Sequence, residues 1–119
     1  MTEQETVQAT DPVHAFISTT VAEHAVVLFM KGTPDAPRCG FSSLAVQILD
    51  HLGAPFVGVD VLQDDGLRDG IKAYADWPTI PQLYVKGEFV GGSDIVREMF
   101  QAGELKALMD EKGVVLGEA

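Results

Sequence analysis

Hydrophobic residues recur three or four positions apart in four segments of the chain, and short unbroken apolar runs lie between these segments. The first pattern is typical of helices that bury one face, and the second of buried strands. Asp11 followed by Pro12 predicts the start of the first helix, because aspartate caps the backbone N–H groups and proline suits the first helical position. The predicted helices begin at Asp11-Pro12, near Cys39 or Ser42, after Asp64-Asp65 and after Gly91-Gly92-Ser93-Asp94.

The strands are predicted over residues 26–30, 56–61, 82–85 and 88–90, and the last two flank Lys86-Gly87, a hairpin signal. The order of elements is helix, strand, helix, strand, helix, strand, strand, helix, with a break in the last helix at Gly103. An early strand–helix–strand unit implies parallel pairing. We therefore expect an α/β sandwich with a mixed four-stranded sheet flanked by helices, a flexible N-terminus over 1–10, one domain over 11–112 and a C-terminal tail over 113–119.

The composition limits the kinds of partner. The chain has 119 residues, 18 acidic against 8 basic side chains and a net charge of −10. Nucleic acid and anionic membrane surfaces attract basic faces, so neither is an expected partner. The first residues are acidic and resemble neither a secretory signal nor a transit peptide, which predicts a cytoplasmic protein.

Cys39 is the only cysteine, which excludes a disulfide or a multi-cysteine metal site within one chain. It follows a loop over residues 31–38 and opens a predicted helix, beside Arg38 and after Lys31. A helix N-terminus and nearby cations favour a thiolate that reacts or binds metal. The alternative is a small buried apolar side chain. Ser42 stands where a Cys-x-x-Cys motif has its second thiol, and its ordinary role is a helix cap, so a reacting Cys39 would need an external thiol.

Three other groups have two interpretations each. The segment from Trp77 to Pro81 either ends a helix or presents the backbone of Ile80 to an extended ligand. The segment from Gly91 to Asp94 is either a capped turn or an anion site whose aspartate takes an ammonium group. Arg68 and Lys72 share a helix face, which is either solvated or binds a carboxylate.

Three segments together are similar to the monothiol glutaredoxins of the Cys-Gly-Phe-Ser class, and the resemblance extends from about Asp11 to Met109. These segments are Lys31-Gly-Thr-Pro-Asp-Ala-Pro-Arg-Cys-Gly-Phe-Ser42, Trp77-Pro-Thr-Ile-Pro-Gln-Leu-Tyr84 and Gly91-Gly-Ser-Asp-Ile95. The resemblance implies a thioredoxin-like three-layer sandwich and a glutathione site. The five residues inserted between Thr33 and Cys39 are typical of the class.

The resemblance also implies a role for each matching residue. Cys39 would be the reacting or metal-ligating thiolate, and the other residues would bind glutathione along its length. The glycine carboxylate would contact Lys31, Arg68 and Lys72, the cysteinyl unit would pair with the backbone of Ile80 before a cis Pro81 beside Thr79, and the γ-glutamyl end would contact Gly92, Ser93 and Asp94.

A [2Fe–2S] cluster needs four thiolate-type ligands, of which one chain supplies one. The resemblance implies that two chains and two glutathiones complete the set, and that the homodimer transfers the cluster to apo iron–sulfur acceptor proteins, with a BolA-like protein as a further partner. The alternative is a glutathione-dependent oxidoreductase that releases glutathione from proteins, for which the class implies weak activity at most. A third alternative is a regulatory module whose cluster reports iron supply.

Overall fold

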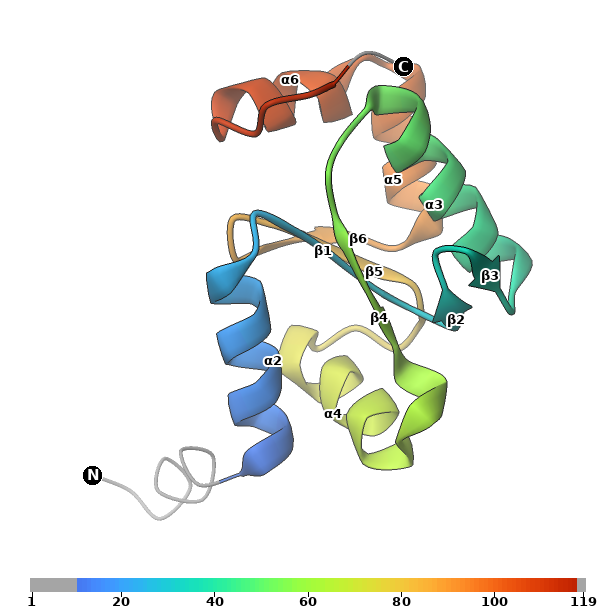
Figure 1. The fold of residues 1–119 in the computed structure, drawn as a ribbon, viewed down its shortest axis with the longest axis vertical. Helices are drawn as coiled ribbons and strands as arrows, with labels where there is room; N and C mark the ends of the chain where they lie inside the picture. Colours follow the sequence, from blue (N-terminus) through green and yellow to red (C-terminus); the bar gives the residue numbers. More distant parts are fainter. Residues whose placement is uncertain (1–10, 118–119) are drawn as a thin grey trace.

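The computed structural model describes residues 11–117, and its main helices and strands follow one another in the predicted order (Figure 1). The predicted 1–10 segment lies outside the described residues. The elements are α2 (Pro12–Glu23), β1 (Val26–Met30), β2 (Gly32–Thr33), β3 (Ala36–Pro37), α3 (Gly40–Leu52), β4 (Val57–Asp60), the 3-10 turn η1 (Val61–Gln63), α4 (Asp65–Ala75), β5 (Gln82–Val85), β6 (Glu88–Gly91), α5 (Ser93–Gln101) and α6 (Glu104–Glu111).

The central sheet has four strands in the order β4-β1-β5-β6. Strand β1 pairs in parallel with β4, with Val27 opposite Val57, and antiparallel with β5, with Val27 opposite Tyr84. Every residue of β1 is at most 1% exposed. An unbroken apolar run is what a strand covered on both faces requires, so the sequence pattern over 26–30 and the mixed α/β sheet are both confirmed.

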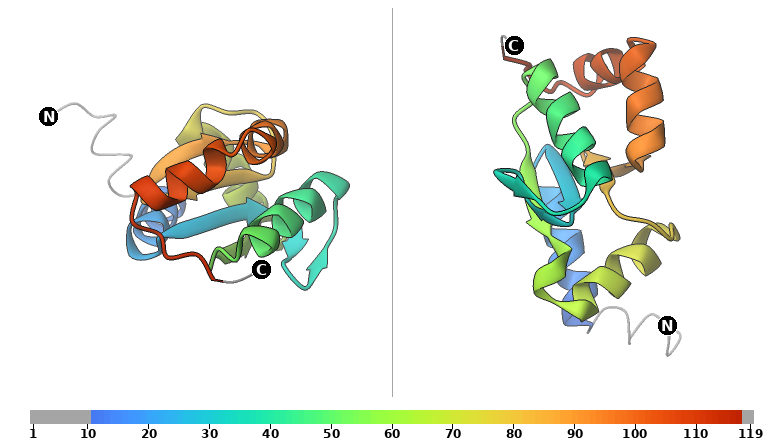
Figure 2. Two further views of the ribbon diagram at one scale, coloured as in Figure 1. Left: turned by 90° about the horizontal axis from the view of Figure 1, so that it is seen from above. Right: turned by 90° about the vertical axis from the view of Figure 1, so that its right-hand side faces the viewer.

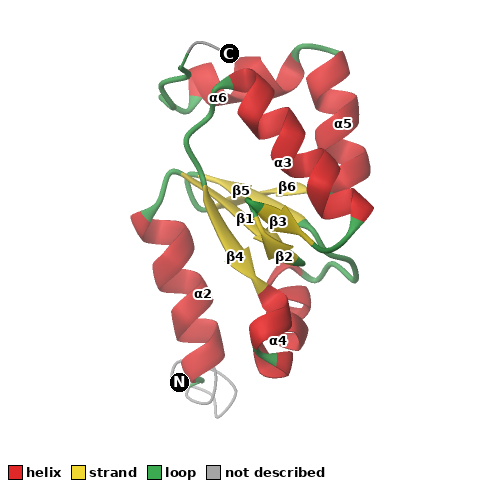
Figure 3. Ribbon diagram, turned by 45° about the vertical axis from the view of Figure 1, so that its right-hand side comes forward, coloured by secondary structure: helices red, strands yellow, loops and turns green. Residues whose placement is uncertain are grey.

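Helices cover both faces of the sheet (Figures 2 and 3). Because successive strand side chains point to opposite faces, Leu28 and Met30 pack with α3, α5 and α6, whereas Val27 and Phe29 pack with α2 and α4. The result is a three-layer sandwich with one apolar core on each side of the sheet.

Some local predictions were wrong. Ser42 does not cap a helix: Cys39 is the N-cap residue of α3, and Ser42 is fully buried in its first turn. The turn from Gly91 to Asp94 has no side-chain cap, because Gly92 is the N-cap residue of α5. The strand predicted over 56–61 is limited to Val57–Asp60, because the Asp60 carboxylate accepts the N–H of Leu62 at 2.9 Å and turns the chain into η1.

The segment after α6 returns to the end of α3. Val114 is only 5% exposed, and the N–H of Gly117 donates to the carbonyl oxygen of Gly53 at 2.7 Å. Gly53 has φ +70°, and a Cβ atom there would collide with the backbone carbonyl of Gly117. Glycine is therefore needed at this position both for its backbone angle and for close approach of the C-terminal segment.

We expect Gly53→Ala to lower the free energy of unfolding more than Gly103→Ala does. Both glycines have left-handed φ angles, so each substitution adds about 1–2 kcal/mol of backbone strain. A Cβ atom at Gly103 has open space, whereas a Cβ atom at Gly53 would collide with the backbone of Gly117. Overpacking of this kind costs about 1–3 kcal/mol more. Urea unfolding at 25 °C measures both losses. Equal losses would contradict the docking of the C-terminal segment.

Candidate functional site

Cys39 lies at the point where the β2–β3 hairpin meets the first turn of α3. Its backbone is extended, at φ −155° and ψ 138°, and its side chain makes no capping hydrogen bond. The thiol is free and partly buried. An N-terminal position on a helix of 13 residues puts the sulfur where unpaired backbone N–H groups and the helix dipole favour negative charge.

The surroundings of Cys39 stabilise its thiolate. Burial by itself raises the pKa of the thiol, but the backbone N–H groups of Ser42 and Phe41, the ammonium of Lys31 and the hydroxyl of Ser42 act in the other direction and bring the pKa of Cys39 below that of an ordinary cysteine. The interpretation of Cys39 as an inert buried side chain is therefore disfavoured, because reactive cysteines are accessible and have lowered pKa values.

A cavity of about 370 Å³ opens beside Cys39. This volume is within the usual range for small-molecule sites. Three loops supply its wall: the segment around Cys39, the turn before β5 and the start of α5. The lining residues are Lys31, Cys39, Phe41, Thr79, Ile80, Pro81, Ser93 and Asp94.

Seven residues predicted for the site meet in this wall, whereas three do not. Arg68 and Lys72 lie on α4, outside the lining. Gly92 is also outside the lining, although a Cβ atom there would be 3.2 Å from Trp77 Nε1 and 3.4 Å from the Pro81 carbonyl oxygen. Phe41 was not predicted as a site residue. Its signal in the sequence is a large apolar side chain directly after Cys39-Gly40, and it is 60% exposed.

The turn before β5 lies in the cavity wall together with the thiol. The Ile80–Pro81 peptide bond is cis, as the resemblance implied, and Ile80 is largely buried before the first residue of β5. Gln82 supports the turn from below, since its side-chain amide donates to the carbonyl oxygens of Trp77 and Thr79, both at 3.2 Å. These two hydrogen bonds hold the turn in place against the buried start of β5.

Opposite charges stand in the cavity wall. Lys31 follows β1, and Asp94 lies in the first turn of α5. The Asp94 carboxylate has one weak ion pair, with Arg97 at 3.9 Å, and its side chain is 79% exposed. The N-terminus of α5 has no side-chain cap, so its first N–H groups also face outward. An extended zwitterionic ligand fits this distribution of charge.

Arg68 has unused hydrogen-bonding capacity. Its Nε atom is buried without a partner among the residues that the structure describes, and its guanidinium lies 3.9 Å from Asp65, an exposed pair that contributes little. A buried donor without a partner is unfavourable. Because the buried Nε is closed to a ligand, a carboxylate beyond the cavity wall would bind the accessible part of the guanidinium, in a side chain that is 41% exposed.

Ser42 cannot take the place of a second cysteine. Its side chain is fully buried, and its Oγ accepts the N–H of Lys31 at 3.0 Å. Over residues 11–117, no group of three or more His, Cys, Asp or Glu side chains is arranged to hold a metal ion. A single chain therefore offers one thiolate, and a multi-ligand metal cluster needs ligands from elsewhere.

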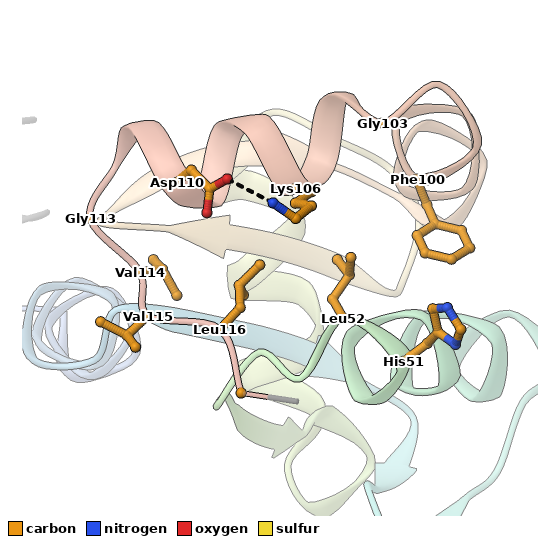
Figure 4. A pocket seen from close by; sticks show the side chains of 11 residues that line it. His51, Leu52, Phe100, Gly103, Lys106, Asp110, Gly113, Val114, Val115 and Leu116 are labelled. Atoms are coloured by element: carbon orange, nitrogen blue, oxygen red, sulfur yellow. Dashed lines mark hydrogen bonds and ion pairs between the residues drawn. The ribbon is translucent and has the colours of Figure 1, made fainter. Parts of the chain in front are cut away.

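A larger hollow, of about 790 Å³, lies between the ends of α3 and α5, the helix α6 and the C-terminal segment (Figure 4). Its lining is mostly apolar. Its charged pair, Lys106 and Asp110, is already joined at 3.1 Å, and His51 packs edge-on against Phe100 with ring centroids 5.4 Å apart. This hollow contains no thiol, so the chemistry favours the smaller cavity beside Cys39 as the functional site.

None of the helices in the described part of the chain is long and apolar enough to cross a membrane. Relatives with mitochondrial and chloroplastic names match the chain, among them a protein of Oryza sativa at 48% identity, so the cytoplasmic location stays a prediction.

Comparisons with known proteins agree with this geometry. The family model described as glutaredoxin matches residues 26–90. A monothiol glutaredoxin of Synechocystis is 55% identical over 96 residues, covering 81% of this chain and 90% of that protein, and a probable monothiol glutaredoxin of Rickettsia typhi is 52% identical over 101 residues, covering 84% and 91%. The solution structure of reduced poplar apo GrxS14 has a TM-score of 0.78 at 47% identity, covering 89% of this chain and 96% of that one. The chain thus belongs to the glutaredoxin family, and to its monothiol members.

Proposed function

We propose that this chain binds glutathione in the cavity beside Cys39 and, as a homodimer, carries a [2Fe–2S] cluster to acceptor proteins. The observation that carries the proposal is a single thiolate-favouring cysteine in the wall of a cavity that also presents Lys31 and Asp94. Glutathione is an extended peptide with two carboxylates and an ammonium group, so it matches these charges and can pair with the backbone of Ile80 in the cavity wall.

The residues of the chain divide the binding of glutathione between them. The ammonium of Lys31 and the accessible part of the Arg68 guanidinium are the donors for one carboxylate, and Lys72, one helical turn beyond Arg68, adds to the positive potential there. The N–H groups at the start of α5 and the Asp94 carboxylate bind the amino acid end. The cis turn at Ile80–Pro81 holds the peptide between them, with its sulfur beside Cys39.

The number of ligands argues for a dimer. Cys39 is the sole thiol of one chain, and a [2Fe–2S] cluster takes four ligands of this kind. Two Cys39 thiolates and two glutathione thiolates complete the set. Because two of the four ligands are not tied to a protein chain, the cluster is easily released, which suits transfer to an apo iron–sulfur protein. A BolA-like protein in place of one subunit is part of the same proposal.

A second candidate function is the removal of glutathione from proteins, favoured by the lowered pKa of Cys39. The Cys39 thiolate would attack the glutathione sulfur of a mixed disulfide, forming a new disulfide and releasing the protein thiolate. A second glutathione thiolate would then restore Cys39 and leave as glutathione disulfide. Since Ser42 has no thiol, the chain has no route through an internal disulfide.

We expect Cys39→Ser to lose the cluster and keep its fold. After anaerobic reconstitution with iron, sulfide and glutathione, wild-type protein should show visible absorption in a fraction with the mass of a dimer, and the variant should be colourless. Without glutathione, the wild type should be colourless too. Ser43→Ala is the control, because Ser43 accepts only the Gln47 amide, at 3.1 Å, among its described side-chain partners. A colourless wild-type monomer would favour the oxidoreductase.

Arg68→Ala should weaken glutathione binding by about 10- to 100-fold, since a hydrogen bond to a charged group contributes about 1.5–3 kcal/mol. Isothermal calorimetry with reduced glutathione measures this loss. Lys106→Ala is the control, because Lys106 is an exposed cation that pairs with Asp110 at 3.1 Å in the larger hollow and lies outside the wall of the cavity beside Cys39. An unchanged affinity in Arg68→Ala would remove this arginine from the site.

The rate at which iodoacetamide alkylates Cys39 should rise with pH. The midpoint of this rise should lie at a lower pH than for free glutathione, because the pKa of Cys39 is lowered. Lys31→Gln removes an ammonium that stabilises the thiolate, so the midpoint should move to higher pH. Lys86→Gln should leave it unchanged, since Lys86 follows β5 at the opposite end of the sheet. Mass spectrometry of timed samples gives the rates. A midpoint equal to that of glutathione would contradict the assigned environment.

A further inference from the structure

The β2–β3 hairpin connects Lys31, the cationic residue of the cavity wall, to Cys39. Residues 32–38 are the only covalent link between Lys31 and Cys39. The two strands pair through Gly32 opposite Pro37 and Thr33 opposite Ala36, which is too short a ladder to hold itself in place. The position of Lys31 relative to Cys39 therefore depends on what holds the base of this hairpin.

Three hydrogen bonds hold that base. The N–H of Lys31 donates to Ser42 Oγ at 3.0 Å, its carbonyl oxygen accepts the N–H of Arg38 at 2.9 Å, and the N–H of Gly32 donates to Asp60 Oδ1 at 3.0 Å. The first two lie within the hairpin and α3. The third reaches 28 residues along the chain, to the end of β4.

Asp60 is well placed for this task. In the sheet register it lies opposite Met30, the residue before Lys31. The same carboxylate accepts the N–H of Leu62 at 2.9 Å and the side-chain amide of Gln63 at 3.1 Å, so its own orientation is fixed. Arg38 also attracts it electrostatically. One side chain thus joins the base of the hairpin to the edge strand of the sheet.

Gly58 provides a second contact between the hairpin and β4. A Cβ atom at Gly58 would lie 2.5 Å from Pro34 Cγ and 2.7 Å from its Cδ. Pro34 is at the tip of the hairpin, between β2 and β3. The tip consequently packs on the face of β4 only because residue 58 has no side chain.

We propose that Asp60 is a positioning residue of the site: by fixing the base of the β2–β3 hairpin, with Gly58 seating its tip, it keeps the Lys31 ammonium beside the Cys39 sulfur. The inference rests on the proposed function, since Lys31 and Cys39 act there on the same ligand. Asp60 is not among the residues that line the cavity.

The test measures the local potential at Cys39 without glutathione. Iodoacetate is an anion and iodoacetamide is neutral, so the ratio of their alkylation rates at one pH reports nearby positive charge, and the fraction of thiolate cancels. The wild-type ratio should exceed that of free glutathione, and Lys31→Gln should lower it. Asp60→Ala should also lower the ratio. The fall should be more than half of the difference between wild-type protein and Lys31→Gln.

The direction in which the rate ratio changes shows whether Lys31 has moved or whether only the charge of Asp60 has been lost. Removing the Asp60 carboxylate without moving Lys31 would leave more net positive charge and raise the ratio. Asp60→Asn keeps an oxygen to accept the N–H groups of Gly32 and Leu62 while losing the charge, so its ratio should equal or exceed the wild-type value. Gly58→Ala keeps Asp60 and displaces Pro34, so it should lower the ratio even where Asp60→Ala does not fold.

Asp11→Ala is the matched control for lost stability. Asp11 also accepts a backbone N–H, that of Val13 at 2.9 Å, but caps α2 away from the site. Its ratio should stay at the wild-type value. An undiminished ratio in folded Asp60→Ala or in Gly58→Ala, or an equal fall in Asp11→Ala, would overturn the proposal. If wild-type protein binds no glutathione in calorimetry but the ratios change as expected, the proposed function fails and the positioning role of Asp60 stands.

Discussion

The site depends on one constraint, the burial of β1 between two layers of helices. Both faces of this strand are covered, so its direction and register are fixed by packing rather than by any group at the site. Because β5 runs antiparallel to β1, with Phe29 opposite Gln82, the start of β5 lies beside the end of β1. Lys31, Cys39 and the cis turn at Ile80–Pro81 are thereby brought to the same end of the two central strands, although Ile80 comes 41 positions after Cys39 in the sequence.

The replacement of a second thiol by Ser42 has consequences for both stability and chemistry. A buried hydroxyl must have a hydrogen-bond partner, and Ser42 finds one in the N–H of Lys31. The position that would carry a resolving cysteine in a Cys-x-x-Cys motif is thus used to attach the cationic loop to α3. The chain cannot complete a disulfide internally, so a thiolate that is favoured by its surroundings must combine with a thiol or a metal from outside.

Local patterns in the sequence predicted most of the fold. The apolar run over 26–30, the caps at Asp11 and Asp64 and the break at Gly103 each depend on neighbouring residues, and each is present in the structure. The two-residue strands β2 and β3 were missed, because so short a segment has no periodicity. The resemblance brought together seven residues that the structure places in the cavity wall. It also named Arg68, Lys72 and Gly92, which lie outside this lining, and their contacts with glutathione stay predictions. The bond between Gly32 and Asp60 joins residues 28 apart, so no local pattern indicates it.

The charge of the chain bears on how the proposed dimer would behave. Each subunit has a net charge of −10, so two subunits repel one another over the Debye length, about 8 Å at physiological ionic strength. Lys31 and Arg38 offset this locally around Cys39, where two subunits would meet, but the rest of each surface does not. The exposed Phe41 adds only one large apolar side chain to the wall of the cavity. The shared cluster and its glutathione ligands would therefore provide most of the attraction between the subunits. After transfer of the cluster to an acceptor, the two subunits would dissociate. A carrier built in this way separates as a consequence of delivering its cargo.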